Sequence, residues 1–210
     1  MTFWLDPTKT TEEIAQELLG CLIIKKTEEG ICSGWIVETE AYLGEIDAAA
    51  HSYGLKKTPR LASMYKEAGT IYIYSMHTHQ MLNLVVQEAG IPQAILIRAI
   101  EPYTGIELME ERRGKYGITL TDGPGKLTKA LAIDKSDDGA SINEPPLYLS
   151  KTHRRIPKEI GVSARIGIPN KGEWTDALLR YTVIGNPYVS RIKGKTDNDL
   201  GWEGTIETDH

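Results

Sequence analysis

The chain has 210 residues, of which 40% are hydrophobic and 25% are charged, and its formal net charge at pH 7 is −5. This composition excludes a disordered chain, and the length suits a single domain with its own core, which we expect over residues 1–210. Apolar runs are too short to span a membrane, and residues 1–10 lack the pattern of a signal peptide. We therefore expect a cytoplasmic protein with no membrane partner, whose two cysteines are reduced.

The negative net charge argues against a nucleic-acid-binding protein, but the charges are unevenly distributed. Residues 1–50 contain ten acidic and three basic residues, whereas residues 151–195 contain ten Lys or Arg and three acidic residues. Because affinity for a polyanion depends on local charge, this basic segment is able to bind phosphates, although a solvated surface is the commoner explanation. Residues 196–210 contain five acidic residues and no Lys or Arg, and we expect a loose acidic tail there.

Capping and turn patterns predict three helices. Thr10 and Glu13 form a capping-box pattern ahead of apolar residues at helical spacing, and this first helix ends at a glycine. Thr104 and Glu107 repeat the capping-box pattern and predict a second helix. The glycine-rich segment DGPG (122–125) opens a third helix.

Short runs rich in β-branched and aromatic residues predict the strands of a sheet. The stronger runs cover residues 21–24, 34–39, 70–75, 82–87 and 94–100, and weaker ones cover 147–149, 164–168 and 180–184. Strands outnumber helices and do not alternate strictly with them. The sequence therefore predicts an α+β fold, in which one domain is built on a mixed, curved antiparallel sheet with surrounding helices.

Two carboxylates and an arginine on predicted strands suggest a site. Glu38, Glu40 and Tyr42 share one face of a strand, because side chains alternate with a period of two. Arg98 lies inside an apolar strand, and a buried arginine requires a carboxylate or an anionic ligand, for which Glu38 and Glu40 are the natural candidates. The pair is either a structural ion pair or a site where a carboxylate acts as general base on water.

Aromatic rings accompany these charges. Tyr72 and Tyr74 share a strand face, and Tyr42 and His51 add two flat rings. Such rings usually pack in a core, but beside a carboxylate and an arginine they also suit a pocket for a flat heteroaromatic ring.

Two further patterns are ambiguous by themselves. His51, His77 and His79 invite a metal site, but their spacing is generic, and we predict no metal. The segment TDGPGKLTKAL (121–131) opens a helix with Lys126 and Thr128 nearby, which suits either a single phosphate or an ordinary helix start.

Taken together and in order, these segments resemble the alkyladenine (3-methyladenine) DNA glycosylase family of the mammalian type. The resemblance is carried by ETEAYLG (38–44), AAHS (49–52), KTPR (57–60), GTIYIY (69–74), LIRAIEP (96–102), GPGKLTKAL (123–131), ARIGI (164–168), GEW (172–174) and NPYVS (186–190). It covers most of the chain from residue 35 to residue 190.

The resemblance implies roles for individual residues. Glu40 matches the general base that activates water against the anomeric carbon, with Glu38 as a supporting residue and the competitor for that role. Arg98 matches the arginine that positions the water, and the main-chain carbonyl near Ile166 would be the third contact of that water.

For the flipped base, the resemblance implies a pocket. Tyr42, His51 and Tyr74 match the rings that stack on the base. Asn83 matches the asparagine that discriminates against a guanine amino group.

The resemblance also implies contacts with the duplex. The stretch SMHTHQMLN (75–83) is one residue shorter than in the family, and its His77 or Met76 would be the wedge that fills the space of the flipped nucleotide. Lys126 and Thr128 match a phosphate contact.

The activity implied is that of a monofunctional glycosylase that removes alkylated or deaminated purines from duplex DNA at the start of base excision repair. It would act as a monomer without a metal or organic cofactor, in the bacterial cytoplasm and associated with the nucleoid. Two alternatives stay open. One is a module of this fold that binds damaged DNA without cutting, and the other is a metal hydrolase built on the three histidines.

Overall fold

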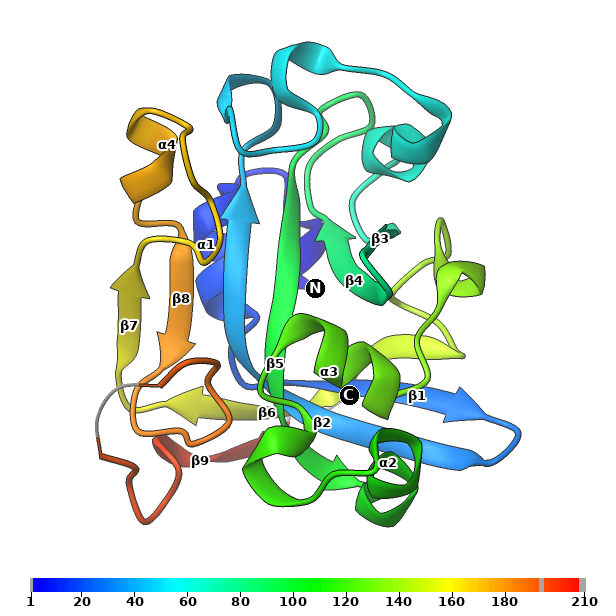
Figure 1. Cartoon of the computed structure of the whole chain (residues 1–210), viewed down its shortest axis with the longest axis vertical. Helices are drawn as coiled ribbons and strands as arrows, with labels where there is room; N and C mark the ends of the chain where they lie inside the picture. Colours follow the sequence, from blue (N-terminus) through cyan, green and yellow to red (C-terminus); the bar gives the residue numbers. More distant parts are fainter. Residues whose placement is uncertain (1, 193–194, 208–210) are drawn as a thin grey trace.

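The computed structural model describes residues 2–192 and 195–207, and its centre is an antiparallel sheet (Figure 1). Within those residues nine strands join one sheet, in the order β3-β4-β5-β2-β1-β6-β9, with β8 paired to β2 and β7 paired to β8. The strands are β1 (Cys21–Thr27), β2 (Gly30–Tyr42), β3 (Ile71–Met76), β4 (His79–Val85), β5 (Ala94–Thr104), β6 (Leu147–Pro157), β7 (Ile160–Ser163), β8 (Arg180–Val183) and β9 (Trp202–Glu207).

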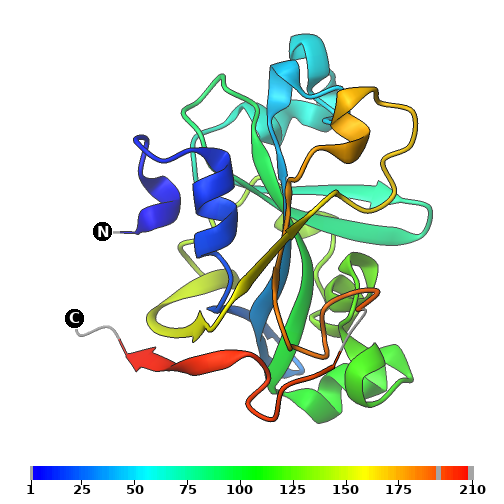
Figure 2. The same cartoon turned by 90° about the vertical axis from the view of Figure 1, so that its left-hand side faces the viewer.

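Helices and loops cover this sheet, which makes an α+β fold, as the sequence predicts. The α-helices are α1 (Thr11–Glu17), α2 (Ile106–Arg113), α3 (Pro124–Ala130) and α4 (Glu173–Asp176). Short 3-10 helices occupy Phe3–Leu5, Gly44–Ile46, Tyr53–Leu55, Pro59–Tyr65, Gly117–Leu120 and Lys135–Asp137. In the view of Figure 2, α1 lies on the side of both termini, while α2, α3 and the β3–β4 hairpin lie on the opposite side of β2 and β5. None of the helices in the described part of the chain is long and apolar enough to cross a membrane.

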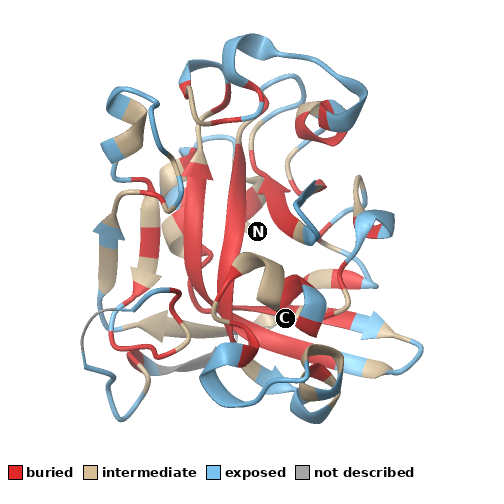
Figure 3. Ribbon diagram, in the orientation of Figure 1, coloured by how far each residue is buried: buried red, intermediate tan, exposed pale blue. Residues whose placement is uncertain are grey.

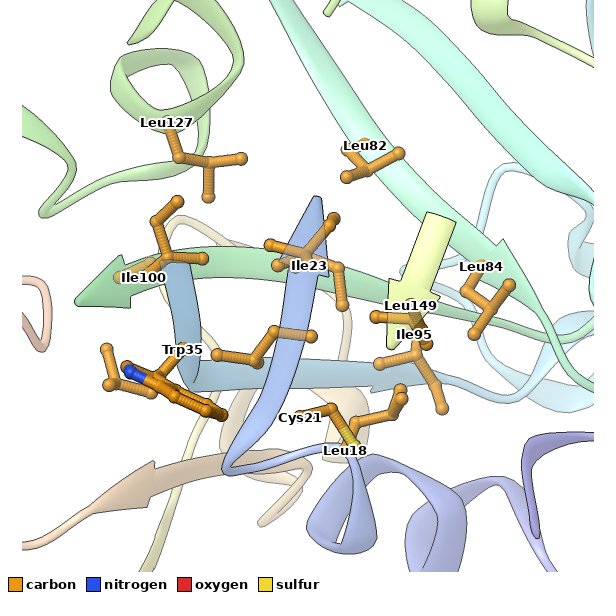
Figure 4. Close-up of a cluster of buried hydrophobic side chains, with 14 of the residues drawn as sticks. Leu18, Cys21, Ile23, Trp35, Leu82, Leu84, Ile95, Ile100, Leu127 and Leu149 are labelled. Carbon is orange, nitrogen blue, oxygen red and sulfur yellow. The ribbon is translucent and has the colours of Figure 1, made fainter. Parts of the chain in front are cut away.

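The core surrounds β2 and β5, which are buried along most of their length (Figure 3). Both faces of these strands are covered, which explains why their sequences read as apolar runs rather than as a strict alternation. Leu18 of α1, Trp35 of β2 and Leu127 of α3 belong to one cluster that extends through the sheet (Figure 4). Both cysteines are free and buried.

Strand β2 is the branch point of the sheet. Its first half pairs with β1 and residues 38–40 pair with β8, while its other edge pairs with β5 from Ser33 to Tyr42. The register between β2 and β5 shifts on both sides of Glu38, which marks a local irregularity. Glu38 and Glu40 therefore lie where three strands meet, and both are completely buried.

The first capping box is confirmed. The side chain of Thr10 accepts a hydrogen bond from the backbone N–H of Glu13 at 3.2 Å, and Glu13 accepts one from the backbone N–H of Thr10 at 2.8 Å. The glycine after this helix, Gly20, has φ +83°, and a Cβ there would lie 1.9 Å from the carbonyl oxygen of Arg155. Only glycine fits this close approach of two backbones.

Three predictions of local structure are wrong. Thr104 ends β5, its hydroxyl is hydrogen-bonded to Ser33, and the helix begins instead after Gly105, which has no side-chain cap. Residues 164–168 are not a strand, because the chain turns immediately after β7.

The predicted loose tail is also wrong for residues 202–207, which form β9 against β6. Trp202 is buried and its indole N–H donates to Glu101 at 2.7 Å, so this strand is anchored by a nonlocal contact. Residues 208–210 of the predicted tail lie outside the described residues.

Candidate active site

A cavity of about 460 Å³ opens where the end of β2 meets the β3–β4 hairpin. Its walls come from β2 to β5, the loop after β2, the start of α3 and the segment after β7. They are formed by Tyr42, Ala49, His51, Met64, Tyr72, Tyr74, Met76, Met81, Asn83, Ala94, Leu96, Arg98, Pro124, Ile166, Gly167, Ile168 and Arg191. The structure thus brings together most of the site residues that the sequence indicates.

Glu40 and Arg98 form a buried ion pair at this cavity. The Nη1 atom of Arg98 lies 3.3 Å from Oε1 of Glu40, and Arg98 lines the cavity. Oε1 also accepts the backbone N–H of Ile166 at 2.8 Å, and Oε2 accepts the hydroxyl of Tyr42 at 2.8 Å. The carboxylate is therefore held by three groups from three segments of the chain.

The electrostatics of Glu40 suit a proton acceptor. Burial raises the pKa of Glu40, and the charge of Arg98 and the hydrogen bonds from Ile166 and Tyr42 only partly oppose this rise. A carboxylate with a raised pKa is a stronger base than one in water, and the opposing groups favour its ionised form. Glu40 therefore has the properties of a general base.

Glu38 is occupied by structural partners. Its carboxylate accepts Nε of Arg98 at 2.9 Å, Nε of Arg180 at 2.7 Å, and both the backbone N–H and the hydroxyl of Ser190, at 2.7 and 2.9 Å. It joins β2, β5, β8 and the segment NPYVS (186–190). Because these partners use its oxygens, Glu38 supports the site rather than offering a free base.

Aromatic rings form the walls. The rings of His51 and Tyr74 are 4.4 Å apart and nearly perpendicular, and Tyr72 donates or accepts a hydrogen bond with Nδ1 of His51 at 3.1 Å. Burial, together with the charges of Arg60 and Lys56, lowers the pKa of His51. A neutral imidazole stacks or hydrogen-bonds at neutral pH without adding charge to the cavity.

Asn83 and Ile166 complete the walls. Asn83 is buried on β4, and its side-chain amide donates to the carbonyls of Tyr72 and Met81, both at 3.2 Å. These bonds fix the orientation of the amide toward the cavity. Ile166, on the segment after β7, also lines the cavity and places its backbone N–H against Glu40.

The tip of the β3–β4 hairpin lies at the cavity. Met76 and His79 form the last pair of the hairpin, so His77 and Thr78 make a two-residue turn, and His77 has φ 54°. Met76 is 47% exposed although it lines the cavity. Both predicted wedge residues therefore lie at the exposed tip.

The start of α3 packs against this hairpin. Lys126 is partly exposed and pairs with Asp122 at 2.7 Å. Thr128 is buried, and its hydroxyl donates to the carbonyl of Gln80 at 2.9 Å, so it anchors α3 to β4 and has no exposed surface for a phosphate. Of the two residues, only Lys126 has a side chain that is partly exposed to solvent.

Comparison with known proteins decides the family. Residues 6–187 match the model of the methylpurine-DNA glycosylase family. The chain belongs to this family. The resemblance of its motifs is thereby confirmed.

Three bacterial relatives each carry the name "Putative 3-methyladenine DNA glycosylase". The one from Enterococcus faecalis is 54% identical over 199 residues, which cover 93% of this chain and 87% of the relative. Those from Staphylococcus haemolyticus and Staphylococcus saprophyticus are 53% and 55% identical, over 89% and 88% of this chain and 92% and 91% of each relative.

A second buried ion pair, Arg165 with Asp47, lies next to the cavity residue Tyr42 in this member of the glycosylase family. Arg165 makes two hydrogen bonds to Asp47, at 2.5 and 2.9 Å, and both side chains are completely buried. The guanidinium of Arg165 also lies 4.6 Å from the centre of the Tyr42 ring. Asp47 lies beside one of the motifs and Arg165 within another, but 118 positions separate them, so no local pattern in the sequence predicts this pair.

The basic segment 151–195 is not one continuous surface for a polyanion. Four of its basic residues pair with acidic side chains of other elements: Arg155 with Glu101, Lys158 with Asp199, Arg165 with Asp47 and Arg180 with Glu38. The exposed cations at the cavity come both from outside this segment and from within it. They include Arg60, 5.6 Å from the ring of Tyr74, and Arg191 at the cavity wall.

The histidines do not gather as a metal site would require. Among the residues with described positions, no three His, Cys, Asp or Glu side chains lie close enough together to hold a metal ion. His51 is hydrogen-bonded to the hydroxyl of Tyr72 at the cavity, whereas His77 lies in the exposed turn of the β3–β4 hairpin.

Proposed function

We propose that the chain hydrolyses the N-glycosidic bond of damaged purines in duplex DNA and so initiates base excision repair. The substrates are alkylated or deaminated purines, of the class of 3-methyladenine, 7-methylguanine, hypoxanthine and ethenoadenine. The observation that carries this proposal is a buried carboxylate, Glu40, paired with Arg98 at a cavity with aromatic walls. The names of the bacterial relatives support the same class of reaction.

The cavity suits a base that has left the duplex. A purine stacked in DNA exposes neither its glycosidic bond nor its faces, so the nucleotide must be flipped out before chemistry. A volume of about 460 Å³ accommodates a purine with its sugar, and Tyr42, His51 and Tyr74 offer ring faces for stacking. The amide of Asn83 lies in the same wall and would contact the edge of the base.

The proposed reaction needs a general base that accepts a proton from water and a negative charge that stabilises the cationic sugar. Glu40 accepts a proton from water while the water oxygen bonds to C1′ and the bond from C1′ to the purine nitrogen breaks. The sugar passes through an oxocarbenium-like state, which the negative charge of Glu40 stabilises. Arg98 and the backbone near Ile166 position the water. A neutral purine such as hypoxanthine takes up a proton as it leaves, whereas a cationic alkylated purine leaves as the neutral base and the proton on Glu40 passes to solvent. An abasic site remains in both cases.

The reaction ends at base release. Strand cleavage by a glycosylase requires an amine that forms a Schiff base with C1′. No lysine is found among the described residues of the cavity wall, which supports base release without strand cleavage, as in a monofunctional enzyme.

The exposed elements around the cavity would face the duplex. His77 or Met76 at the hairpin tip would occupy the space of the flipped nucleotide, and Lys126 with Arg60 would contact phosphates. We propose that the protein acts as a monomer on the nucleoid in the bacterial cytoplasm.

The test is base release from a duplex oligonucleotide with a single hypoxanthine, in excess chelator, by wild type and Glu40→Gln. Wild type should release hypoxanthine, and Glu40→Gln should lose release but keep binding, measured by gel shift. Glu45→Gln, an exposed carboxylate on the next loop, is the matched control and should act like wild type.

Two results would contradict the proposal. Normal base release by Glu40→Gln would show that Glu40 is not the general base and would assign that role to Glu38. Binding without release by the wild type, for hypoxanthine and for alkylated DNA, would identify a damaged-DNA binding module.

A further inference from the structure

Tyr42 contacts the proposed general base as well as the cavity. Its hydroxyl donates to Oε2 of Glu40 at 2.8 Å, while its ring lines the cavity. The other oxygen, Oε1, is held by Ile166 and Arg98. Because Glu40 is completely buried, the tyrosine hydroxyl is what defines the position of its second oxygen.

The ring of Tyr42 is itself held in place by a buried ion pair. The guanidinium of Arg165 lies against its ring at 4.6 Å, and Arg165 Nη1 also donates to the carbonyl of Ala41 at 3.0 Å. Asp47 fixes the guanidinium with two hydrogen bonds. A tyrosine with its ring packed and its hydroxyl bonded has little rotational freedom, so it is preorganised for two tasks.

Resting on the proposed function, we infer that Tyr42 is a positioning residue for Glu40. Its hydroxyl orients the carboxylate for the attacking water, while the same ring forms a wall for the flipped base. Recognition of a base and orientation of the catalytic carboxylate are thereby joined in one side chain.

The charges around Glu40 give this inference a measurable consequence. Arg98 of β5, Glu38 of β2 and the backbone of Ile166 act on Glu40, and Arg180 of β8 acts on Glu38. Tyr74 of β3 stays uncharged, because burial and the charge of Glu40 raise its pKa to about 12. Burial and the charge of Glu40 raise the pKa of Tyr42 well above its usual value, so its hydroxyl remains a donor. Loss of this donor removes a stabiliser of the carboxylate and raises the pKa of Glu40.

Tyr42→Phe is the direct test, because it keeps the ring and removes only the hydroxyl. The measurement is the single-turnover rate of 7-methylguanine release against pH, since a cationic purine needs no protonation to leave. Activity requires ionised Glu40, so it falls as the pH drops through the pKa. The acid limb of Tyr42→Phe should lie about one pH unit above that of wild type.

Tyr74→Phe is the matched control, because it makes the same change in the same cavity. Its acid limb should stay at the wild-type pH, whatever happens to its rate. Titration of ¹³C-labelled Glu40 by NMR in the free proteins should give the same order of pKa values without reference to activity.

The outcomes separate the inference from the proposed function. An upward shift in Tyr42→Phe alone supports the inference. An unchanged limb in Tyr42→Phe, or an equal shift in Tyr74→Phe, would overturn it while the glycosylase activity stands. Absence of release by the wild type would refute the proposed function, and the NMR titration would still decide whether the hydroxyl acts on Glu40.

Discussion

Asp47→Asn should destabilise the folded protein by about 3–5 kcal/mol, because it removes one partner of a fully buried ion pair. Oδ1 of Asp47 accepts Nη2 of Arg165 and the backbone N–H of Ala49, and an asparagine oxygen could keep both bonds. Oδ2 accepts Nη1 of Arg165 and the backbone N–H of Leu43. An amide nitrogen there would face two donors, so two hydrogen bonds are lost and a buried guanidinium loses its counter-charge.

The assay is urea unfolding followed by circular dichroism at pH 7, together with the melting temperature. For a chain of this length each kcal/mol corresponds to about 2–4 °C, so the melting temperature should fall by about 6–20 °C. The urea midpoint should fall with an unchanged slope, because the fold is kept.

An exposed pair provides the control. Asp122 pairs with Lys126, whose side chain is 43% exposed, so Asp122→Asn should cost less than about 1 kcal/mol. If Asp47→Asn destabilises the protein no more than Asp122→Asn does, the buried pair does not hold the loop after β2 in place, and the reasoning is refuted.

Four further outcomes are expected. Glu38→Gln should lower the stability at pH 7 by about 3 kcal/mol, measured by urea unfolding. Glu40→Gln should lose less, because burial raises the pKa of the wild-type carboxylate that it replaces. Arg60→Ala should raise the pKa of His51 in an NMR titration, because it removes a nearby positive charge. In the wild type the pKa of His51 is lower in the folded than in the unfolded state. The neutral imidazole therefore contributes folding stability above the unfolded-state pKa, and this contribution is lost as the pH falls through the folded-state pKa. His77→Ala should weaken base flipping, followed by a fluorescent base, more than Met76→Ala does, and the reverse order would assign the wedge to Met76. Log K for duplex DNA should fall with log salt by about 0.9 per neutralised phosphate, and a flat dependence would exclude phosphate contacts.

Local sequence was sufficient wherever the deciding interactions are local. Thr10 and Glu13 form the predicted capping box because both of its hydrogen bonds lie within one turn. The long apolar strands β2 and β5 were predicted from their composition. Arg98 was matched to Glu38 and Glu40 by a general rule, since a buried arginine requires a carboxylate. The order of motifs identified the family.

Tertiary structure alone decided what depends on distant segments. The sequence placed Glu38 and Glu40 on one strand face, but only the packing of Arg180 and Ser190 against Glu38 separates the structural carboxylate from the proposed base. The basic segment 151–195 looked like a surface for phosphates, yet several of its charges are used within the fold. Trp202 turns a polar tail into β9 by reaching a buried carboxylate 101 positions away. Burial and charge pairing across the chain set these outcomes, and neither is visible in local periodicity.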